Sequence, residues 1–281
     1  MNEKVKVKQL VVPIIVIAIM SAFLLYQFDF FGKPQSKTSS STGDEVSINK
    51  IKDETKNNAE YPEKEKILLR MLDSIDYIKT LEGEYQVFSR DVNEVWTTKY
   101  AVDVKGRRSV VFSVEDNKTI LRLEKEKKKI EFYENDHTYQ EFPPVPMSKN
   151  EDYAKLSPTE RLYGKDRTDD TFAKAANVIH TENSIYLIRY EDWNFKEVTY
   201  LGLPSYKITG VIDKSVSESL AGKFDMIVEK SAGLLLSFNV YDENNKVKHY
   251  FKTKSIKIDK GVNEKVFEKD LSKYKKIENA H

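Results

Sequence analysis

The sequence contains no cysteine, only four histidines and only ten glycines. Without cysteine the chain forms no disulfide, thiolate metal site or thiol nucleophile, and it carries no lipid-modified cysteine. The histidines are scattered outside any HExxH spacing, and the glycines form neither a phosphate-binding loop nor a dinucleotide fingerprint. A GxSxG nucleophile elbow is also absent. We therefore expect no cofactor, no metal and no enzyme activity. A wall-associated hydrolase with an unrecognised site is the remaining enzymatic alternative.

An excess of charge is absent too, since 46 lysines and arginines balance 45 aspartates and glutamates. Nucleic-acid phosphates are recognised by a basic field, so we expect no nucleic-acid partner. A cysteine-free chain that works outside the cytoplasm fits a bacterial source, such as a Gram-positive cell envelope.

A long hydrophobic run occurs only at the N-terminus, where residues 10–26 carry no charge. With the residues up to 31 the run reaches about the 20 residues that span a bilayer. Lysines in residues 1–9 hold that end in the cytoplasm. We expect a cytoplasmic tail (1–9), a single-pass transmembrane anchor (10–31) in the cell membrane, and the rest of the chain outside. A cleaved signal peptide is the alternative, although small residues are poorly placed for cleavage.

Residues 32–60 have no aromatic side chain and are rich in Ser, Thr, Lys and Asn. Such a segment buries too little apolar surface to fold, so we expect a flexible extracytoplasmic stalk. The remainder, 61–281, has the pattern of a folded domain. It opens with apolar side chains at helical spacing, and we predict an amphipathic helix that starts at Pro62, runs to about Leu81 and stops at Gly83.

Strand-like alternation follows the predicted helix. The runs between residues 84 and 142 are separated by short polar turns, and strands joined this closely are antiparallel. Prolines then interrupt the pattern and open a helical insert at about 143–183. The remaining predictions, in chain order, are helices at 152–163 and 169–178, strands within 184–193 and 196–212, a short helix at 214–222, and three strands within 224–259.

Residues 224–251, "FDMIVEKSAGLLLSFNVYDENNKVKHYF", show the alternation best. Two turn signals, "KSAG" and "DENN", divide them into three strands. We predict an α+β fold with one curved, unclosed antiparallel sheet of about ten or eleven strands. One face of the sheet is wet, and the helices cover the other, apolar face.

The order of these elements resembles the C-terminal part of the lipoprotein-carrier superfamily. The resembling segments are a turn with "AGL", a strand closing in "YDENNKV", a strand with "SIKI", and then "VFEKDL". That group includes the periplasmic lipoprotein carrier, its outer-membrane receptor and envelope-stress regulators. The resemblance covers most of residues 61–271 and implies a half-barrel whose concave apolar face, covered by helices, holds acyl chains or a lipidated peptide. This sequence departs from the group in its sizeable insert and its lack of a lipid-modified cysteine, so no functional residue is carried over.

The candidate ligand-binding residues lie on the apolar face of the predicted sheet. They are Trp96, Tyr100, Val102, Phe224, Met226, Val228, Leu234, Leu236 and Phe238. For each of them an ordinary core position is the alternative, because alternation does not distinguish a dry core from a lipid pocket.

Two further segments have open interpretations. Val145 and Met147 lie among the prolines and belong either to a lid or docking loop or to a plain strand–helix connection. The basic run at 124–129 either contacts anionic head groups or is a solvated hairpin turn.

These patterns predict a membrane-anchored, extracytoplasmic binding protein that holds a lipid or lipoprotein acyl segment, with a role in envelope sensing or lipoprotein handling. The alternative is a regulator or assembly factor of the cell envelope that binds a protein partner and no ligand.

Overall fold

The computed structural model of the protein describes residues 60–91, 93–115, 118–125, 128–142, 156–162, 177–179 and 182–278. The predicted tail and anchor, almost all of the predicted stalk, and Val145 and Met147 lie outside these residues. Most of the predicted insert does too, and so do parts of the predicted helices at 152–163 and 169–178. Among the described residues no helix is both long and apolar enough to cross a bilayer.

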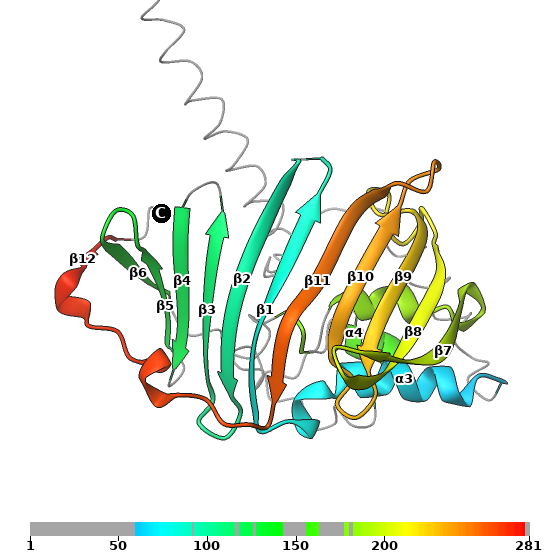
Figure 1. Ribbon diagram of the computed structural model, residues 1–281, viewed down its shortest axis with the longest axis horizontal. Coiled ribbons are helices and arrows are strands. Elements are labelled where there is room, and N and C mark those ends of the chain that lie inside the picture. The colour runs from blue at the N-terminus through cyan, green and yellow to red at the C-terminus, as the bar shows by residue number, and fades with distance from the viewer. Residues whose placement is uncertain are drawn as a thin grey trace, which may run out of the picture. The chain divides into compact units, whose positions relative to one another are not determined.

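The described residues form one unclosed sheet of twelve strands in the order β12-β6-β5-β4-β3-β2-β1-β11-β10-β9-β8-β7 (Figure 1). All neighbours are antiparallel except β12, which runs parallel to β6. The strands are β1 (Thr80–Ser89), β2 (Glu94–Asp103), β3 (Arg108–Glu115), β4 (Lys118–Lys125), β5 (Lys128–Tyr133), β6 (Thr138–Phe142), β7 (Trp193–Tyr200), β8 (Leu203–Ile212), β9 (Gly222–Glu229), β10 (Leu235–Tyr241), β11 (Val247–Ile258) and β12 (Lys275–Lys276).

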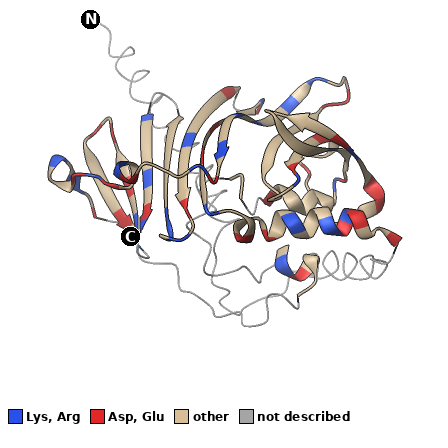
Figure 2. Cartoon of the chain, turned by 60° about the horizontal axis from the view of Figure 1, so that its bottom comes forward, with Lys and Arg blue, Asp and Glu red and all other residues tan. Residues whose placement is uncertain are grey.

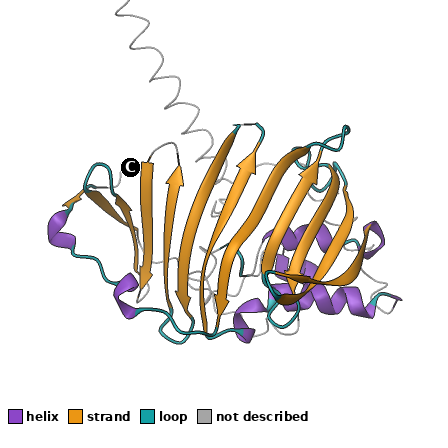
Figure 3. Cartoon of the chain, viewed as in Figure 1, coloured by secondary structure: helices purple, strands orange, loops and turns teal. Residues whose placement is uncertain are grey.

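The described residues form few helices beside this sheet. They are the α-helices α3 (Pro62–Leu72) and α4 (Pro158–Leu162) and the 3-10 helices η2 (Ser74–Tyr77), η5 (Glu182–Leu187), η6 (Tyr190–Asp192), η7 (Glu264–Phe267) and η8 (Leu271–Lys273). Figure 3 shows α3 and α4 at the β7–β10 end of the sheet and η7 and η8 at the other end.

Among the described helices, α3 is the longest, and it packs on the sheet. Pro62 stands in its first turn, where no backbone donor is needed, and Ile67, Leu68, Met71 and Leu72 form its buried stripe. These side chains join one core cluster with residues of β8, β9 and β10. The charged side chains of α3 belong to its other faces, and Figure 2 shows basic and acidic residues interspersed on this helix.

The first helix ends earlier than predicted. After Leu72 the chain forms η2, and β1 begins at Thr80 because the Asp259 carboxylate accepts hydrogen bonds from the backbone of Lys79 (2.6 Å) and Thr80 (3.1 Å). Gly83 therefore lies inside a strand rather than after a helix. A Cβ on it would lie 2.5 Å from the hydroxyl oxygen of Tyr100, so the missing side chain makes room for that ring.

The two faces of the sheet are covered differently. The face that carries Ile208, Met226 and Phe238 packs against α3, and we call it the helix face. On the opposite face, Leu123 and Phe132 pack against the segment 261–277, which we call the strap, and we name this the strap face.

The strap covers the strap face with aromatic and ionic contacts. Phe267 is 2% exposed and lies under the Arg108 guanidinium, 4.5 Å from the ring centroid. Tyr274 meets Phe132 edge-on at 5.1 Å and donates a hydrogen bond to Glu134 (2.8 Å). The strap then pairs with β6 as β12, a two-residue strand too short to leave a sequence pattern.

The prediction of one apolar face was therefore incomplete. Along β8 to β11 and β1 the buried apolar side chains belong to the helix face, whereas along β4 and β5 they belong to the strap face. The change occurs in β2 and β3, where neighbouring residues such as Val110 and Val111 are buried on opposite faces. The alternation thus changes phase across the sheet, because a different segment covers each end.

Two local predictions were wrong. The predicted strand at 184–193 forms η5 and η6 instead, and β7 begins at Trp193. Ser184, Leu187 and Tyr190 are buried at the three-residue spacing of a 3-10 helix. The predicted short helix at 214–222 is a pair of turns. Side-chain acceptors on Asp213 and Ser217 bind nearby backbone donors there and compete with helix formation.

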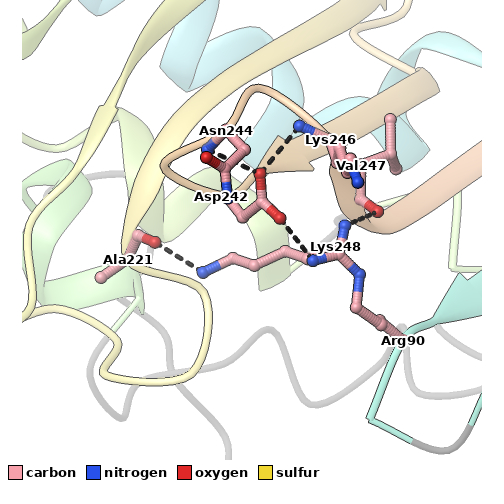
Figure 4. Close-up of polar contacts among 7 residues, drawn as sticks. All are labelled: Arg90, Ala221, Asp242, Asn244, Lys246, Val247 and Lys248. Atoms are coloured by element: carbon pink, nitrogen blue, oxygen red, sulfur yellow. Dashed lines mark hydrogen bonds and ion pairs between the residues drawn. The ribbon is translucent and has the colours of Figure 1, made fainter.

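The turn between β10 and β11 is organised by Asp242 (Figure 4). One carboxylate oxygen accepts hydrogen bonds from the backbone of Asn244 (2.9 Å) and Lys246 (2.8 Å). The other accepts from Arg90, at 2.5 Å, and Arg90 also donates to the Val247 carbonyl. The Arg90 hydrogen bond and these backbone donors hold the pKa of Asp242 below its ordinary value.

Replacing Phe267 by alanine should remove the central side chain of the strap core. We expect Phe267→Ala to lower the free energy of unfolding by about 3 kcal/mol, as for other buried phenylalanines. Its neighbour Val266 is 40% exposed, and Val266→Ala should stay within about 0.5 kcal/mol of the wild type. Urea unfolding measures both, and equal effects would show that the strap is not packed as described.

Asp242→Asn should weaken the β10–β11 turn in a pH-dependent way. A carboxyl group with a lowered pKa in the folded chain stabilises it above the unfolded pKa, about 3.9, and that contribution is lost as the pH falls through the folded pKa. The wild type should therefore exceed Asp242→Asn in stability at pH 7 and lose this advantage below about pH 4. Thermal unfolding from pH 3 to pH 7 measures the difference, with the exposed neighbour Glu243→Gln as control.

Candidate functional site

The helix face of the central strands is laid out by their register. In one row Trp96 of β2 pairs with Val87 of β1, and Val87 pairs with Phe251 of β11. Two further rows cross from β2 to β3, one through Tyr100 and Val111 and one through Val102 and Ser109. Side chains from four neighbouring strands therefore line one continuous surface.

The structure places the nine candidate residues from the sequence on or beside this face. Eight are at most 3% exposed, and Trp96 is half-buried. Leu234 lies just before β10, and a bulge between Leu235 and Ser237 breaks the predicted alternation, so that Leu234, Leu235 and Leu236 are all fully buried. Their assignment as ligand-binding residues remains a prediction.

The β8–β10 part of the helix face is densely filled. Phe224, Met226, Val228 and Phe238 share one cluster with the buried stripe of α3, and the Tyr186 ring stacks on Phe238 with centroids 5.5 Å apart. A hollow beside this cluster, between η5 and the end of β8, measures about 20 Å³, enough for a water molecule and far too small for an alkyl chain.

The short helix α4 is fixed to α3 by a buried arginine. Both oxygens of Asp73 accept hydrogen bonds from Arg161, at 2.8 and 2.9 Å, and the Arg161 side chain is 7% exposed. This bidentate pair joins the C-terminal end of α3 to the insert that the sequence predicted.

Three aromatic side chains lie together on the central strands, next to the part of the helix face that packs against α3. The Tyr85 ring lies 4.6 Å from that of Phe251 and 5.8 Å from that of Tyr100, measured between centroids. Asn177 donates a hydrogen bond to the Tyr85 hydroxyl (3.1 Å). Burial, with Tyr85 nearby, raises the pKa of Tyr100 far above its ordinary value, so Tyr100 presents a neutral hydroxyl.

Beyond β3 the helix face becomes polar. β4 contributes Arg122 and Glu124, and β5 contributes Lys129 and Glu131. Glu131 pairs with Arg122 (3.1 Å) and with Lys129 (3.3 Å). Burial raises the pKa of Glu124 to about 7 against the attraction of Lys129, and Glu131 adds to the rise.

Sequence patterns did not indicate several residues of this surface, among them Ser109, Glu124 and Thr253. Ser109 on β3 and Glu124 on β4 each lie between an apolar and a basic residue, and Thr253 on β11 lies between two lysines, so none of the three has the pattern of a buried face. Their burial follows from tertiary packing, which alternation does not report. The basic run at 124–129, which the sequence analysis singled out, includes Glu124. The run spans the end of β4 and the start of β5, and residues 126–127 lie outside the described part.

The described residues contain no group of three or more histidine, aspartate or glutamate side chains placed to hold a metal ion. The chemistry available on the helix face is therefore apolar contact, hydrogen bonding by neutral hydroxyls, and the charges of β4 and β5.

No family model and no curated protein matches the chain. Solved structures do. An uncharacterised conserved protein from Thermus thermophilus matches with a TM-score of 0.44 and 13% identity, over 76% of this chain and 98% of that one. The lipoprotein LppX of Mycobacterium tuberculosis gives 0.39 and 11%, over 72% and 98%. MucB of Pseudomonas aeruginosa, in complex with MucA, gives 0.37 and 10%, over 76% and 62%.

These neighbours are similar to about three quarters of this chain. With identities of 10–13% and TM-scores below 0.5, they assign no ligand, partner or residue role to this chain.

Glu124→Gln should change how stability depends on pH. The unfolded carboxyl group has a pKa of about 4.3, so the folded chain, with a pKa of about 7, loses stability as the pH rises between these values. The variant lacks this titration. We expect it to gain up to about 3 kcal/mol over the wild type at pH 8 and almost nothing at pH 4.

Urea unfolding at pH 4, 6 and 8 measures this gain. Glu243→Gln, at an exposed turn, is the control and should follow the wild type at every pH. A gain for Glu124→Gln that is the same at all three values would contradict the burial of this carboxyl group.

Proposed function

We propose that the chain is an extracytoplasmic binding protein that holds an acyl segment of a lipid or lipoprotein on the helix face of a half-barrel, whose concave side is that face. One observation carries the proposal. The apolar layer of the helix face continues over β11, β1, β2 and β3, through Phe251, Tyr85, Val102 and Val111, whereas α3 and α4 lie at the β7–β10 end (Figure 1).

The proposed position of the acyl segment follows from this difference between the extent of the apolar layer and the position of α3 and α4. The β8–β10 part packs against the buried stripe of α3. The four side chains of the central strands named above are also at most 4% exposed, but no described helix lies over them. An alkyl chain that took the place of their present cover would gain about 0.8 kcal/mol per CH₂ group. We infer that the ligand lies along β1–β3, beside the half-buried Trp96.

We propose further that residues 10–31 anchor this domain in the cell membrane, with the domain outside, and that it binds rather than catalyses. An anchored binding domain is suited to sensing or to handing over a lipoprotein within the reach of its stalk. The uncharged run of residues 10–26 and the lysines before it support this location.

The two tryptophans allow a direct test. Trp96 lies beside the proposed seat, and Trp193 is 1% exposed on the edge strand β7. A brominated fatty acid should quench the Trp96 fluorescence of the wild type, and Trp96→Phe, which retains Trp193, should lose the quenching. Mass spectrometry of lipids extracted from the purified chain gives an independent measurement. Absence of both quenching and co-purified lipid would rule out the proposal.

A specific patch favours the second candidate, a protein-binding envelope regulator. On the strap face Val95 is 51% exposed and Val114 is 41% exposed, and Val95 pairs with Phe88, which stacks on Tyr250 at 5.3 Å. Exposed apolar clusters of this kind often contact proteins.

A photocrosslinker at position 95 tests this candidate in cells, with position 211 as control, because Val211 is equally exposed (53%) but lies on β8, far along the sheet. A partner captured at 95 and not at 211 would favour the regulator. Equal capture at both positions would contradict a specific surface.

A further inference from the structure

The two ends of the sheet carry opposite charges. Antiparallel pairing brings the starts of β1, β3 and β5 and the ends of β2, β4 and β11 together at the lower end in Figure 1. The described residues there are 79–80, 103–108, Lys125, Lys128 and 258–265, and they carry eight basic and three acidic side chains. We call this the basic end of the sheet.

The opposite end is acidic. The described residues of 89–94, 115–118, 133–138 and 241–247 carry three basic and seven acidic side chains. Ten-residue strands such as β1 and β2 separate the two ends by about 30 Å. A chain whose net charge is +1 therefore places +5 at one end of these strands and −4 at the other.

The acidic side chains of the basic end are already bound within the protein. Arg108 pairs with Asp103 at 2.7 Å and with Glu264 at 2.6 Å. The Asp259 carboxylate accepts hydrogen bonds from the backbone at the start of β1. The lysines of this end that are exposed and form no ion pair with a described carboxylate are Lys79, Lys105, Lys128, Lys260 and Lys265.

The basic end presents a row of side chains rather than a pocket. Its exposed lysines belong to separate strand ends and turns, from Lys128 of β5 to Lys260 after β11. The six neighbouring strands from β5 to β11 extend across about 24 Å, at about 4.8 Å from one strand to the next. This row is much wider than a phosphate group, so it matches an extended anionic surface rather than a small anion.

The basic run at 124–129 is part of this row, since it supplies Lys125 and Lys128. Its two interpretations were a contact with anionic head groups and a solvated hairpin turn. Solvated surfaces normally mix the two signs of charge. Here the β2–β3 turn, with Lys105 and Arg107, and the start of the strap repeat the positive sign. The shared sign favours the contact with head groups.

We propose that the basic end docks this domain on the anionic surface of the cell membrane, with the acidic end directed away from it. The inference rests on the proposed membrane location, because residues 10–31 would bring the domain to that surface, and it is independent of the acyl ligand. A lysine close to an anionic bilayer strengthens binding about fivefold. Salt screens these charges beyond about 8 Å, so only direct approach of the basic end gains from them.

The absence of cysteine allows this orientation to be measured in the full-length protein. Val266→Cys at the basic end or Asn244→Cys at the acidic end, both at exposed positions, carries a single fluorescent donor. The protein is reconstituted into phosphatidylcholine vesicles with or without phosphatidylglycerol, and a rhodamine-labelled lipid is the acceptor. With phosphatidylglycerol we expect about twofold more energy transfer from position 266 than from position 244. In about 1 M salt, or without phosphatidylglycerol, the difference should disappear.

Removal of charge from the basic end should abolish this difference. The triple variant carries Lys105→Gln, Lys128→Gln and Lys260→Gln. We expect its docking on phosphatidylglycerol to weaken about 100-fold, because each lysine contributes about fivefold. Circular dichroism confirms that the variant is folded.

The matched control removes three exposed lysines at the acidic end. It carries Lys214→Gln, Lys223→Gln and Lys246→Gln. Both triple variants change the net charge by the same amount, so a difference between them reports the position of the charges. The control should keep the energy transfer of the wild type.

Equal transfer from both positions with phosphatidylglycerol, or wild-type behaviour of the basic-end variant, would overturn the docking proposal while the acyl-binding function stands. Binding of soluble heparin without any transfer that depends on phosphatidylglycerol would identify a soluble polyanion as the partner and would also overturn it. If a carbonate wash removes the protein from the vesicles, the proposed anchor is wrong. Flotation of the full chain with both kinds of vesicle then decides: capture by phosphatidylglycerol vesicles alone supports docking, and capture by neither contradicts it.

Discussion

The twelve-stranded sheet has more face than the described helices α3 and α4 cover, and the hydrophobic residues are distributed accordingly. Every strand must bury its apolar side chains on the face where cover exists. At the β7–β11 end the cover is α3, and at the β4–β6 end it is the strap on the opposite face. The central strands β2 and β3 carry apolar side chains on both faces. The proposed ligand site lies on the helix face of these strands, beyond the end of α3 and opposite the face that the strap covers.

Much of the fold could be predicted from the sequence because its signals are local. The β9–β10–β11 meander follows from alternation and from turn residues such as Asp242 and Gly233, whose conformations are set within a few residues. The wrong predictions concern segments whose secondary structure depends on contacts with residues distant in the sequence. The carboxylate of Asp259 binds the backbone at the start of β1, where the first helix was predicted to continue, and Leu187 and Tyr190 are buried in 3-10 helices where a strand was predicted.

The candidate site was only partly predictable for a related reason. Alternation identified Tyr100 and Val102, since large apolar residues indicate a buried face. It gave no indication of Ser109 or Thr253, because a small polar residue in a strand has the same pattern whether it meets water or the protein interior. Glu124 was noticed only as part of a basic run, and its raised pKa comes from burial that the sequence does not express.

The pairing of β1 with β11 has a consequence for how the chain reaches this state. Leu81 pairs with Ile258, so two adjacent strands near the middle of the sheet come from opposite ends of the domain. Until β11 has been synthesised, the β1–β6 meander and the β7–β10 meander are separate blocks with open edges. Open edges invite association between chains, and late long-range closure is slow. The two blocks therefore keep open edges until almost the whole domain has been synthesised.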